Sequence, residues 1–342
     1  MFRWAVIGLV ALAAVALDAQ VALQPRFDVL IVNGTVIDGT GAPGQRLDIG
    51  IRDHRIVELG TLTNAPTKAR IDARGLVVAP GFIDVHTHAD NIAEHPLAEN
   101  FAQMGVTTIV AGNCGSSALD ISDAFDRIRA TRISINYATL VGHNTIRESV
   151  MGTTNRLPRM DELHRMKSLV FKAMVDGAVG FSTGLQYIPG TYAKSNEITE
   201  LARVAGNEGG IYATHMRNEG TALEAAIKES ITVARLTDVP LEISHLKIDS
   251  PAQWGMAAKA LTMIDDARKR GMKVQADQYA YTAGSSSLSI RFPSWALEGG
   301  SDAIRKRLTD AATWAKVKKD MQALLAERGF TDLSWATIAT YR

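Results

Sequence analysis

The alternation of apolar and polar residues sets residues 26–80 apart from the rest of the chain. Short runs such as FDVLIVNGTVIDGTG and LDIGIRDHRIVELG alternate with a period of two, and they break at Asn33-Gly34 and Asp38-Gly39. This pattern predicts half-buried strands, and the Asn-Gly and Asp-Gly pairs are typical of hairpin turns. We therefore expect a small β domain in this region.

The pattern changes after residue 80 to apolar runs that alternate with helical segments. The runs are GFIDVHTH, VTTIVAGNCG, INYATLVGH, GAVGFSTG, GGIYATH, PLEISH and MKVQADQYAY. Apolar residues recur at helical spacing in GTALEAAIKESITVARL and SNEITELARVAGNEG, which predicts two helices. Asn196 is the expected N-cap of the second. Strand–helix units of about 30 residues predict a parallel sheet, most simply a (β/α)8 barrel, with seven strands identified.

Metal-binding side chains recur where these predicted strands end. His86 and His88 are two residues apart, so in a strand they share one face with Asp84. Later strands end at Cys114, His143, His215 and His245. Active sites of (β/α)8 barrels lie at the carboxyl ends of the strands. We therefore predict a metal site at this rim, because packing alone does not readily produce such a coincidence.

The charge balance and the first residues of the chain indicate which partners and which cellular location to expect. The 342 residues include 37 Lys and Arg against 36 Asp and Glu, so no charge excess indicates nucleic acid as a partner. Residues 1–19 have a short basic start, an apolar run and a cleavage point at Ala19, which predicts a signal peptide and a periplasmic or secreted protein. The alternative is an uncleaved anchor. After cleavage we expect no membrane association, and the lone Cys114 excludes an internal disulfide.

Several motifs together resemble the amidohydrolase superfamily, and more narrowly the N-acyl-D-amino-acid deacylases, or D-aminoacylases. The motifs are GFIDVHTH, GNCG, VGHNTIR, GFSTGLQYIPGTYA, ATHMRNEG, ISHLK and DQYAYTAGSS. The resemblance runs from about residue 26 to the end of the chain. It implies an α/β fold: a metal-dependent (β/α)8 barrel over residues 81–342, with residues 26–80 as the first part of a β-sandwich.

The resemblance also implies zinc and a set of ligands. Cys114, His215 and His245 would hold one tightly bound ion, and His86 and His88 would bind a weaker or second one. The alternative for Cys114 is a buried apolar filler. A thiolate is a strong ligand for zinc, which favours the ligand role. Arg217 and Glu219 are expected to pair with each other or to hold a ligand in place.

The implied reaction is hydrolysis of an N-acyl-D-amino acid by metal-activated hydroxide, giving a D-amino acid and a carboxylate. Lys247 and Tyr281 match residues that hold the substrate carboxylate. Tyr192, Tyr187 and Ser287 are further candidates for the pocket, with aromatic packing as the alternative for the two tyrosines. His143 either polarises the substrate carbonyl or orients a neighbour.

The resemblance also implies an aspartate at the end of an eighth strand, acting as general acid–base, and no such residue is assigned in this chain. Asp277 is expected to lie deeper in the barrel, two residues before Tyr279. A truncated sequence would explain the missing strand, and we expect a chain that really ended here to fold poorly or to be inactive. Two alternatives therefore stay open: a related enzyme acting on cyclic amides or D-dipeptides, and a non-catalytic metal-binding fragment. The number of metal ions and the oligomeric state also stay open.

Overall fold

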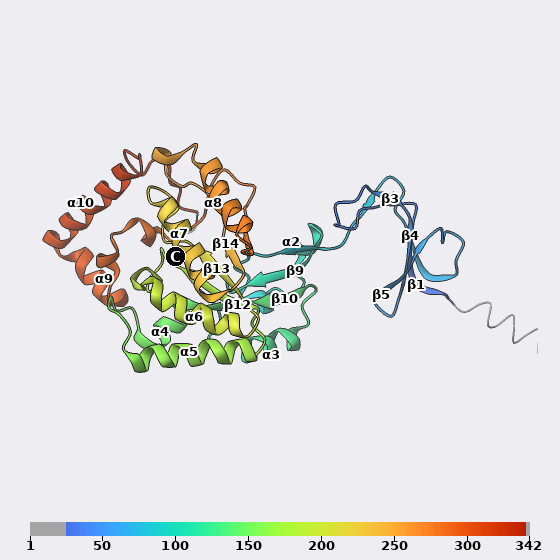
Figure 1. The fold of residues 1–342 in the computed structure, drawn as a ribbon, viewed down its shortest axis with the longest axis horizontal. Helices are drawn as coiled ribbons and strands as arrows, with labels where there is room; N and C mark the ends of the chain where they lie inside the picture. The colour runs from blue at the N-terminus through green and yellow to red at the C-terminus, as the bar shows by residue number, and fades with distance from the viewer. Residues whose placement is uncertain (1–24, 340–342) are drawn as a thin grey trace, which may run out of the picture. The chain divides into compact units, whose positions relative to one another are not determined.

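The computed structural model describes residues 25–339 as two compact units, with the boundary after Gly81 (Figure 1). The signal peptide expected at residues 1–19 lies outside the described residues. Within the described part of the chain, no helix has both the length and the apolar character needed to cross a membrane.

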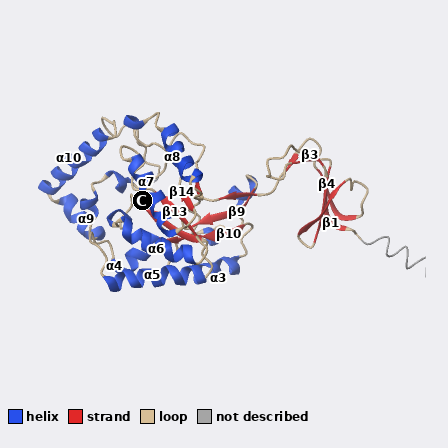
Figure 2. Ribbon diagram, viewed as in Figure 1, coloured by secondary structure: helices blue, strands red, loops and turns tan. Residues whose placement is uncertain are grey.

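The first unit consists of strands in two small sheets, drawn as arrows in Figure 2. One sheet has the order β5-β4-β1-β6 and the other the order β3-β2-β7. The strands are β1 (Phe27–Val32), β2 (Thr35–Val36), β3 (Gln45–Arg46), β4 (Asp48–Arg52), β5 (Arg55–Gly60), β6 (Thr67–Asp72) and β7 (Val77–Val78). The β domain expected from the alternating pattern is therefore present.

Of the two hairpin turns predicted in this unit, at Asp38-Gly39 and at Asn33-Gly34, the structure has only the first. Asp38-Gly39 lies in the connection between β2 and β3, which pair antiparallel as a hairpin. Asn33, with a φ of 65°, lies between β1 and β2, which belong to different sheets. The hairpin expected at Asn33-Gly34 is therefore wrong: the turn passes the chain from one sheet to the other. Here Asp48 accepts a hydrogen bond from the Asn33 backbone N–H and holds the turn.

The second unit is built on parallel strands in the order β8-β9-β10 and β11-β12-β13-β14-β15. Their bounds are β8 (Phe82–Asp84), β9 (Val106–Ala111), β10 (Asn136–Thr139), β11 (Val141–Gly142), β12 (Gly180–Gly184), β13 (Ile211–His215), β14 (Leu241–Ile243) and β15 (Val274–Ala276). Strands β10 and β11 are separated by Leu140 alone and form one predicted strand. The seven predicted strands and the α/β class are therefore confirmed.

Helices follow most of these strands, as a barrel of βα units requires. The α-helices are α2 (Glu99–Gln103), α3 (Ile121–Thr131), α4 (His143–Met151), α5 (Met160–Val175), α6 (Ser195–Asn207), α7 (Leu223–Thr237), α8 (Ala257–Lys269), α9 (Gly300–Thr309) and α10 (Ala311–Glu327). Short 3₁₀ turns are η1 (Ile92–Glu94), η2 (Gly190–Tyr192), η3 (Pro251–Gln253), η4 (Leu288–Arg291) and η5 (Ser294–Leu297). Helix α6 begins at Ser195, so Asn196 lies inside it and is not the N-cap.

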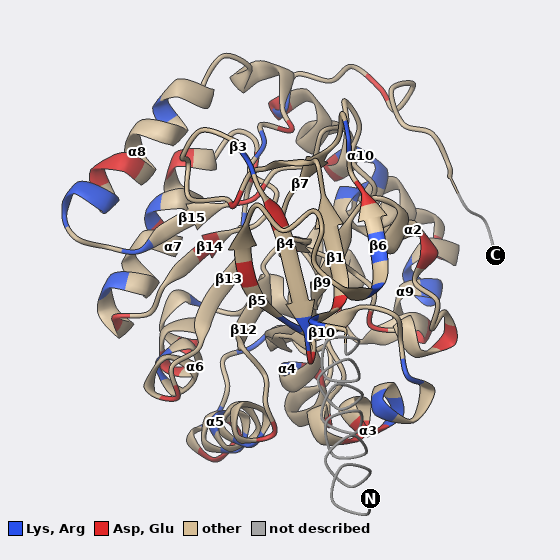
Figure 3. Cartoon of the chain, turned by 90° about the vertical axis from the view of Figure 1, so that its right-hand side faces the viewer, with Lys and Arg blue, Asp and Glu red and all other residues tan. Residues whose placement is uncertain are grey.

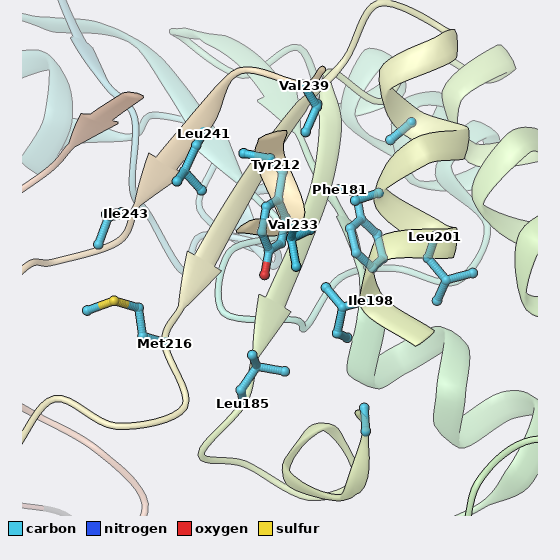
Figure 4. Packing of buried hydrophobic residues seen from close by; sticks show 14 of the residues in the cluster. Phe181, Leu185, Ile198, Leu201, Tyr212, Met216, Val233, Val239, Leu241 and Ile243 are labelled. Atoms are coloured by element: carbon cyan, nitrogen blue, oxygen red, sulfur yellow. The ribbon is translucent and has the colours of Figure 1, made fainter. Parts of the chain in front are cut away.

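The main core lies between the strands and the helices that cover them (Figure 4). Phe181 on β12 stacks on Tyr212 of β13 with ring centroids 6.1 Å apart. Ile198 and Leu201 of α6 belong to the same fully buried cluster. Burying one such side chain stabilises the fold by about 1.5–3 kcal/mol, so this layer fixes the strands whose ends carry the candidate ligands.

Charged residues of both signs occupy the helices, as the blue and red segments of α8 show in Figure 3. On α8, Arg268 pairs with Asp265 and Lys269 with Asp266, each at 3.1 Å. These exposed pairs contribute little stability. They agree with the near-equal numbers of acidic and basic residues in the sequence.

Candidate metal centre

Four predicted ligands converge beyond the carboxyl ends of four strands. His86 and Cys114 follow β8 and β9, His215 ends β13, and His245 follows β14. The Sγ atom of Cys114 lies 3.5 Å from Nε2 of His86 and 3.5 Å from Nε2 of His245. The rings of His215 and His245 have centroids 4.5 Å apart. Residues separated by more than 150 positions in the sequence therefore meet at one rim.

Among the described residues, the ligand atoms form two overlapping groups that could hold a metal ion. One group is His86, Cys114 and His245, and the other is His215, Glu219 and His245. His245 belongs to both groups. His86, which the resemblance assigned to a second ion, thus lies beside Cys114, whereas His215 groups with Glu219. Which ion each residue holds stays a prediction.

The ring of His215 gives an independent test of whether a cation fits. The residue is buried, and neither ring nitrogen has a hydrogen-bond partner among the described residues. Buried polar atoms are almost always paired, so an unpaired imidazole needs an explanation. Burial lowers the pKa of His215 to about 3, which keeps the ring in the neutral form that binds metals. The residues present therefore fit a metal ion.

His88 does not join either group. Its ring lies 5.5 Å from that of His86, and its side chain is exposed. Strand β8 ends at Asp84, so His86 and His88 lie beyond the strand on whose face they were expected together with that residue. A ligand role for His88 stays a prediction.

The backbone at two of the candidate ligands is left-handed. Cys114 has a φ of 54° and His245 a φ of 38°, a region that residues other than glycine rarely adopt. Such conformations concentrate at functional sites. Gly112 and Gly115, on either side of the cysteine, also have positive φ.

Gly184 lies where two backbone segments approach each other closely. It ends β12, and a Cβ atom placed there would lie 2.0 Å from the carbonyl oxygen of Cys114. A glycine is therefore required because the cysteine loop passes directly against the strand. This close approach fixes the depth at which the Sγ atom enters the site.

Two carboxylates contact the candidate ligands. Asp277 Oδ2 lies 3.1 Å from Nδ1 of His86, and its Oδ1 accepts a hydrogen bond from the backbone N–H of His245. Glu219 Oε1 lies 2.9 Å from Nδ1 of His245. Carboxylates that bond the second ring nitrogen orient a histidine ligand and fix its tautomer.

The position expected for Asp277 is wrong. Strand β15 ends at Ala276, so Asp277 is the first residue beyond the strand. It lies at the rim and not deep in the barrel. The missed signal is that Asp277 directly follows a strand, as the other candidate residues do.

The electrostatics of the site favour a bound cation. Burial raises the pKa of the Cys114 thiol to about 12, so the metal-free thiol stays protonated. A coordinated thiol loses its proton, because the cation stabilises the thiolate. Burial opposes ionisation of Glu219, but the hydrogen bond with His245 and the charges nearby hold its pKa at about 2. Glu219 is therefore an anion beside the candidate ligands.

The predicted substrate-binding residues do not lie together. Lys247 points into the centre, where its Nζ donates to Glu219 Oε1 at 2.7 Å. Tyr281 is 79% exposed, and Ser287 caps η4 through Ser289. The buried Tyr192 donates its hydroxyl to the Ser294 carbonyl at 2.9 Å, which favours the packing alternative.

Tyr187 lies closer to the centre than Tyr192 does. Its ring centroid is 4.7 Å from that of His215, and its hydroxyl lies 3.3 Å from Ser286 Oγ. Burial raises the pKa of Tyr187 to about 12, so the phenol is neutral at physiological pH. Tyr187 is therefore placed to cover one side of the His215 ring.

His143 lies behind the site, in the first turn of α4. Its side chain is fully buried, and Nε2 lies 2.8 Å from Oε1 of Glu197. Arg147 Nε donates to the same oxygen. Asn144 lies next to His143 and donates to the carbonyl of Gly184. This arrangement favours the orienting role of His143 over a role in polarising the substrate.

Of the two alternatives for Arg217 and Glu219, the mutual pair is wrong, whereas the contact with a candidate ligand is present for Glu219. Arg217 forms two hydrogen bonds of 2.9 Å with Glu229 on α7. Glu219 contacts His245 and Lys247 instead. The two side chains leave the loop after β13 in different directions.

Comparisons with known proteins agree with the resemblance in the motifs. The sequence profile of the Amidohydrolase family matches residues 69–316. The D-aminoacylase of Alcaligenes xylosoxydans xylosoxydans is 38% identical over 336 residues, which cover 90% of this chain and 66% of that protein. The N-acyl-D-glutamate deacylase of the same organism is 40% identical over 291 residues, covering 78% and 59%. This chain therefore spans about three fifths to two thirds of the length of these relatives.

A solved structure is also similar. The N-acyl-D-glutamate deacylase of Bordetella bronchiseptica, complexed with zinc and a phosphonate inhibitor, matches with a TM-score of 0.72 and 39% identity. The match covers 75% of this chain and 59% of that one. The family profile thus covers most of the second unit. The chain belongs to the amidohydrolase family.

Proposed function

We propose that the protein is a zinc-dependent hydrolase that cleaves the amide bond of N-acyl-D-amino acids, giving a D-amino acid and a carboxylate. The observation that carries the proposal is the approach of Cys114 Sγ to within 3.5 Å of two histidine Nε2 atoms from distant strands. The similarity to a D-aminoacylase and to N-acyl-D-glutamate deacylases supports the substrate class.

The donor set suits zinc. Cys114, His86 and His245 would hold the ion, with His215 beside them, and a thiolate with neutral imidazoles is a combination that zinc prefers. When bound, zinc would polarise the amide carbonyl and lower the pKa of a water molecule toward about 7.

Residues of the chain would position the ligands and the substrate. Asp277 and Glu219 hold the Nδ1 sides of His86 and His245 and so direct their Nε2 atoms toward Cys114. Lys247 supplies an ammonium group at the rim, where it would pair with the free carboxylate of the substrate. The ring of Tyr187 would keep water from one side of His215.

The proposal is tested by measuring zinc content together with amine release from N-acetyl-D- and N-acetyl-L-amino acids. We expect bound zinc and turnover of the D-substrates alone. Cys114→Ala should lose both zinc and turnover, because it removes the only thiol in the chain.

Ser116→Ala is a matched control, since Ser116 is an exposed residue of the same loop. It should keep the zinc content and the activity of the wild type. Full zinc content in folded Cys114→Ala would overturn the ligand assignment. Zinc without turnover of either series would instead point to another amide, or to the non-catalytic alternative.

A further inference from the structure

Glu219 is a buried carboxylate at the centre of the site. It lies in the loop after β13, four residues beyond His215, with its side chain 3% exposed. Oε1 lies 2.9 Å from His245 Nδ1 and 2.7 Å from Lys247 Nζ. Oε2 lies 3.8 Å from His215 Nε2. One buried anion thus contacts two candidate metal ligands and the candidate carboxylate-binding lysine.

The two nitrogens of His245 face different partners. Nε2 faces the Sγ atom of Cys114 at 3.5 Å, while Nδ1 faces Glu219. A histidine that binds a metal through Nε2 carries its proton on Nδ1 and donates it to a neighbouring acceptor. Glu219 therefore acts on the side of the ring that points away from Cys114, which separates it from a direct ligand of an ion held by that thiolate.

Glu219 also holds the side chain of Lys247 in place. Its ammonium lies 3.0 Å from Nδ1 of His245, on a ring that would also contact a cation. The ammonium of Lys247, the Nδ1–H group of His245 and a cation bound to the same ring would repel one another at such distances. The carboxylate of Glu219 between them compensates this repulsion. Without that charge, the flexible lysine would turn away from the rim.

We propose that Glu219 is a positioning residue that holds His245 in its metal-binding tautomer and keeps Lys247 at the rim to receive the substrate carboxylate. Metal binding and recognition of the acid group then depend on one side chain. The part concerning His245 needs only a bound metal, whereas the part concerning Lys247 rests on the proposed function.

The metal arm of the test compares Glu219→Ala and Glu219→Gln. The glutamine keeps an acceptor for the Nδ1–H of His245, and the alanine does not. We expect Glu219→Ala to raise the zinc dissociation constant, measured by competition with a chelator, about 10–100-fold. Glu219→Gln should stay within about threefold of the wild type, because the acceptor is retained. Nitrogen-15 NMR should show the Nδ1–H tautomer of His245 in the wild type and in Glu219→Gln, and a mixture in Glu219→Ala.

Glu229→Ala is the matched control, because it removes the partner of Arg217 in the same region without touching a candidate ligand. Its zinc affinity should equal that of the wild type. An equal loss of affinity in Glu219→Gln and Glu219→Ala would make Glu219 a direct ligand and overturn the positioning role. Unchanged affinity in both Glu219 variants would overturn it as well.

The substrate arm measures KM and kcat for an N-acyl-D-amino acid with zinc-loaded Glu219→Gln. We expect KM to rise about tenfold with kcat changed less than threefold, because Lys247 loses its counter-ion. An unchanged KM would refute the link to Lys247. A wild-type protein that binds no zinc would refute the proposed function instead, so the two failures are distinguishable.

Discussion

The buried network behind the site allows a quantitative prediction for Glu197→Gln. Glu197 on α6 is 1% exposed, and its Oε1 contacts both His143 Nε2 and Arg147 Nε, whose side chains are fully buried. The guanidinium of Arg147 also donates to two backbone carbonyls, so it cannot turn toward solvent. Removing one charge of a buried pair destabilises by about 3–5 kcal/mol. We expect about 3 kcal/mol, because the glutamine oxygen still accepts one hydrogen bond.

The measurement is urea unfolding of the metal-free protein at pH 7, with Tm as a second readout. A loss of about 3 kcal/mol corresponds to a fall in Tm of roughly 6–12 °C for a unit of this size. Glu200→Gln on the same helix is the control. Its pair with Lys167 is 2.8 Å long, but both side chains are more than a third exposed, so its loss should be below about 1 kcal/mol. Equal losses in the two variants would refute the argument from burial.

Three further predictions concern the site and its surroundings. Gly184→Ala should destabilise the fold by about 1–3 kcal/mol and weaken zinc binding, since its Cβ meets the Cys114 carbonyl; unchanged unfolding and chelator competition would contradict this. Burial, with the charge of Asp277, raises the pKa of Glu242 to about 7. Ionisation of Glu242 therefore costs the metal-free fold stability as the pH rises from about 4.3 to 7, and the full cost remains above pH 7. Because the side chain is partly exposed, Glu242→Gln should gain only about 1–2 kcal/mol over wild type at pH 8, and nothing at pH 4. Zinc at about 1,000 times its dissociation constant should stabilise the protein by about 4 kcal/mol, which calorimetry with and without a chelator measures.

The strand ends and most of the ligands could be predicted because they depend on local pattern and spacing. An apolar run of strand length, followed by a ligand about every 30 residues, marks the rim of a barrel without knowledge of any contact. Cys114, His215 and His245 therefore lie at the rim, as expected. The apolar core follows from the same runs, and Phe181 and Leu241 are fully or almost fully buried.

The residues that sequence reasoning misplaced depend on where strand pairing stops. Asp277 and His88 both lie beyond the last residue of a strand, in runs whose apolar–polar alternation continues past that residue. Side-chain pattern does not record that end point. The partners of Glu219 could not be predicted either, because Lys247 and His245 come from a different strand and meet it only in the folded chain.

The partners of Tyr192 and Lys247 show a second reason why residue roles could not be predicted fully from the sequence. Both residue types suit a substrate pocket, yet the Tyr192 hydroxyl is bonded to Ser294, 102 positions away in sequence. A motif identifies a residue type and its strand, but the atoms that saturate its polar group come from distant loops. Residue type alone therefore does not distinguish a pocket residue from a packing residue.

The left-handed backbone at Cys114 and His245 has a consequence for how the chain responds to selection. A non-glycine residue in this region is disfavoured by about 1–2 kcal/mol, so glycine would suit the backbone at both positions better than the residues present. A mutant library sorted for expression or heat resistance alone should therefore enrich glycine at 114 and 245. The same library sorted for retention of metal should keep cysteine and histidine. Opposite enrichment at these two positions would show that folding and ligand binding make conflicting demands on the same residues.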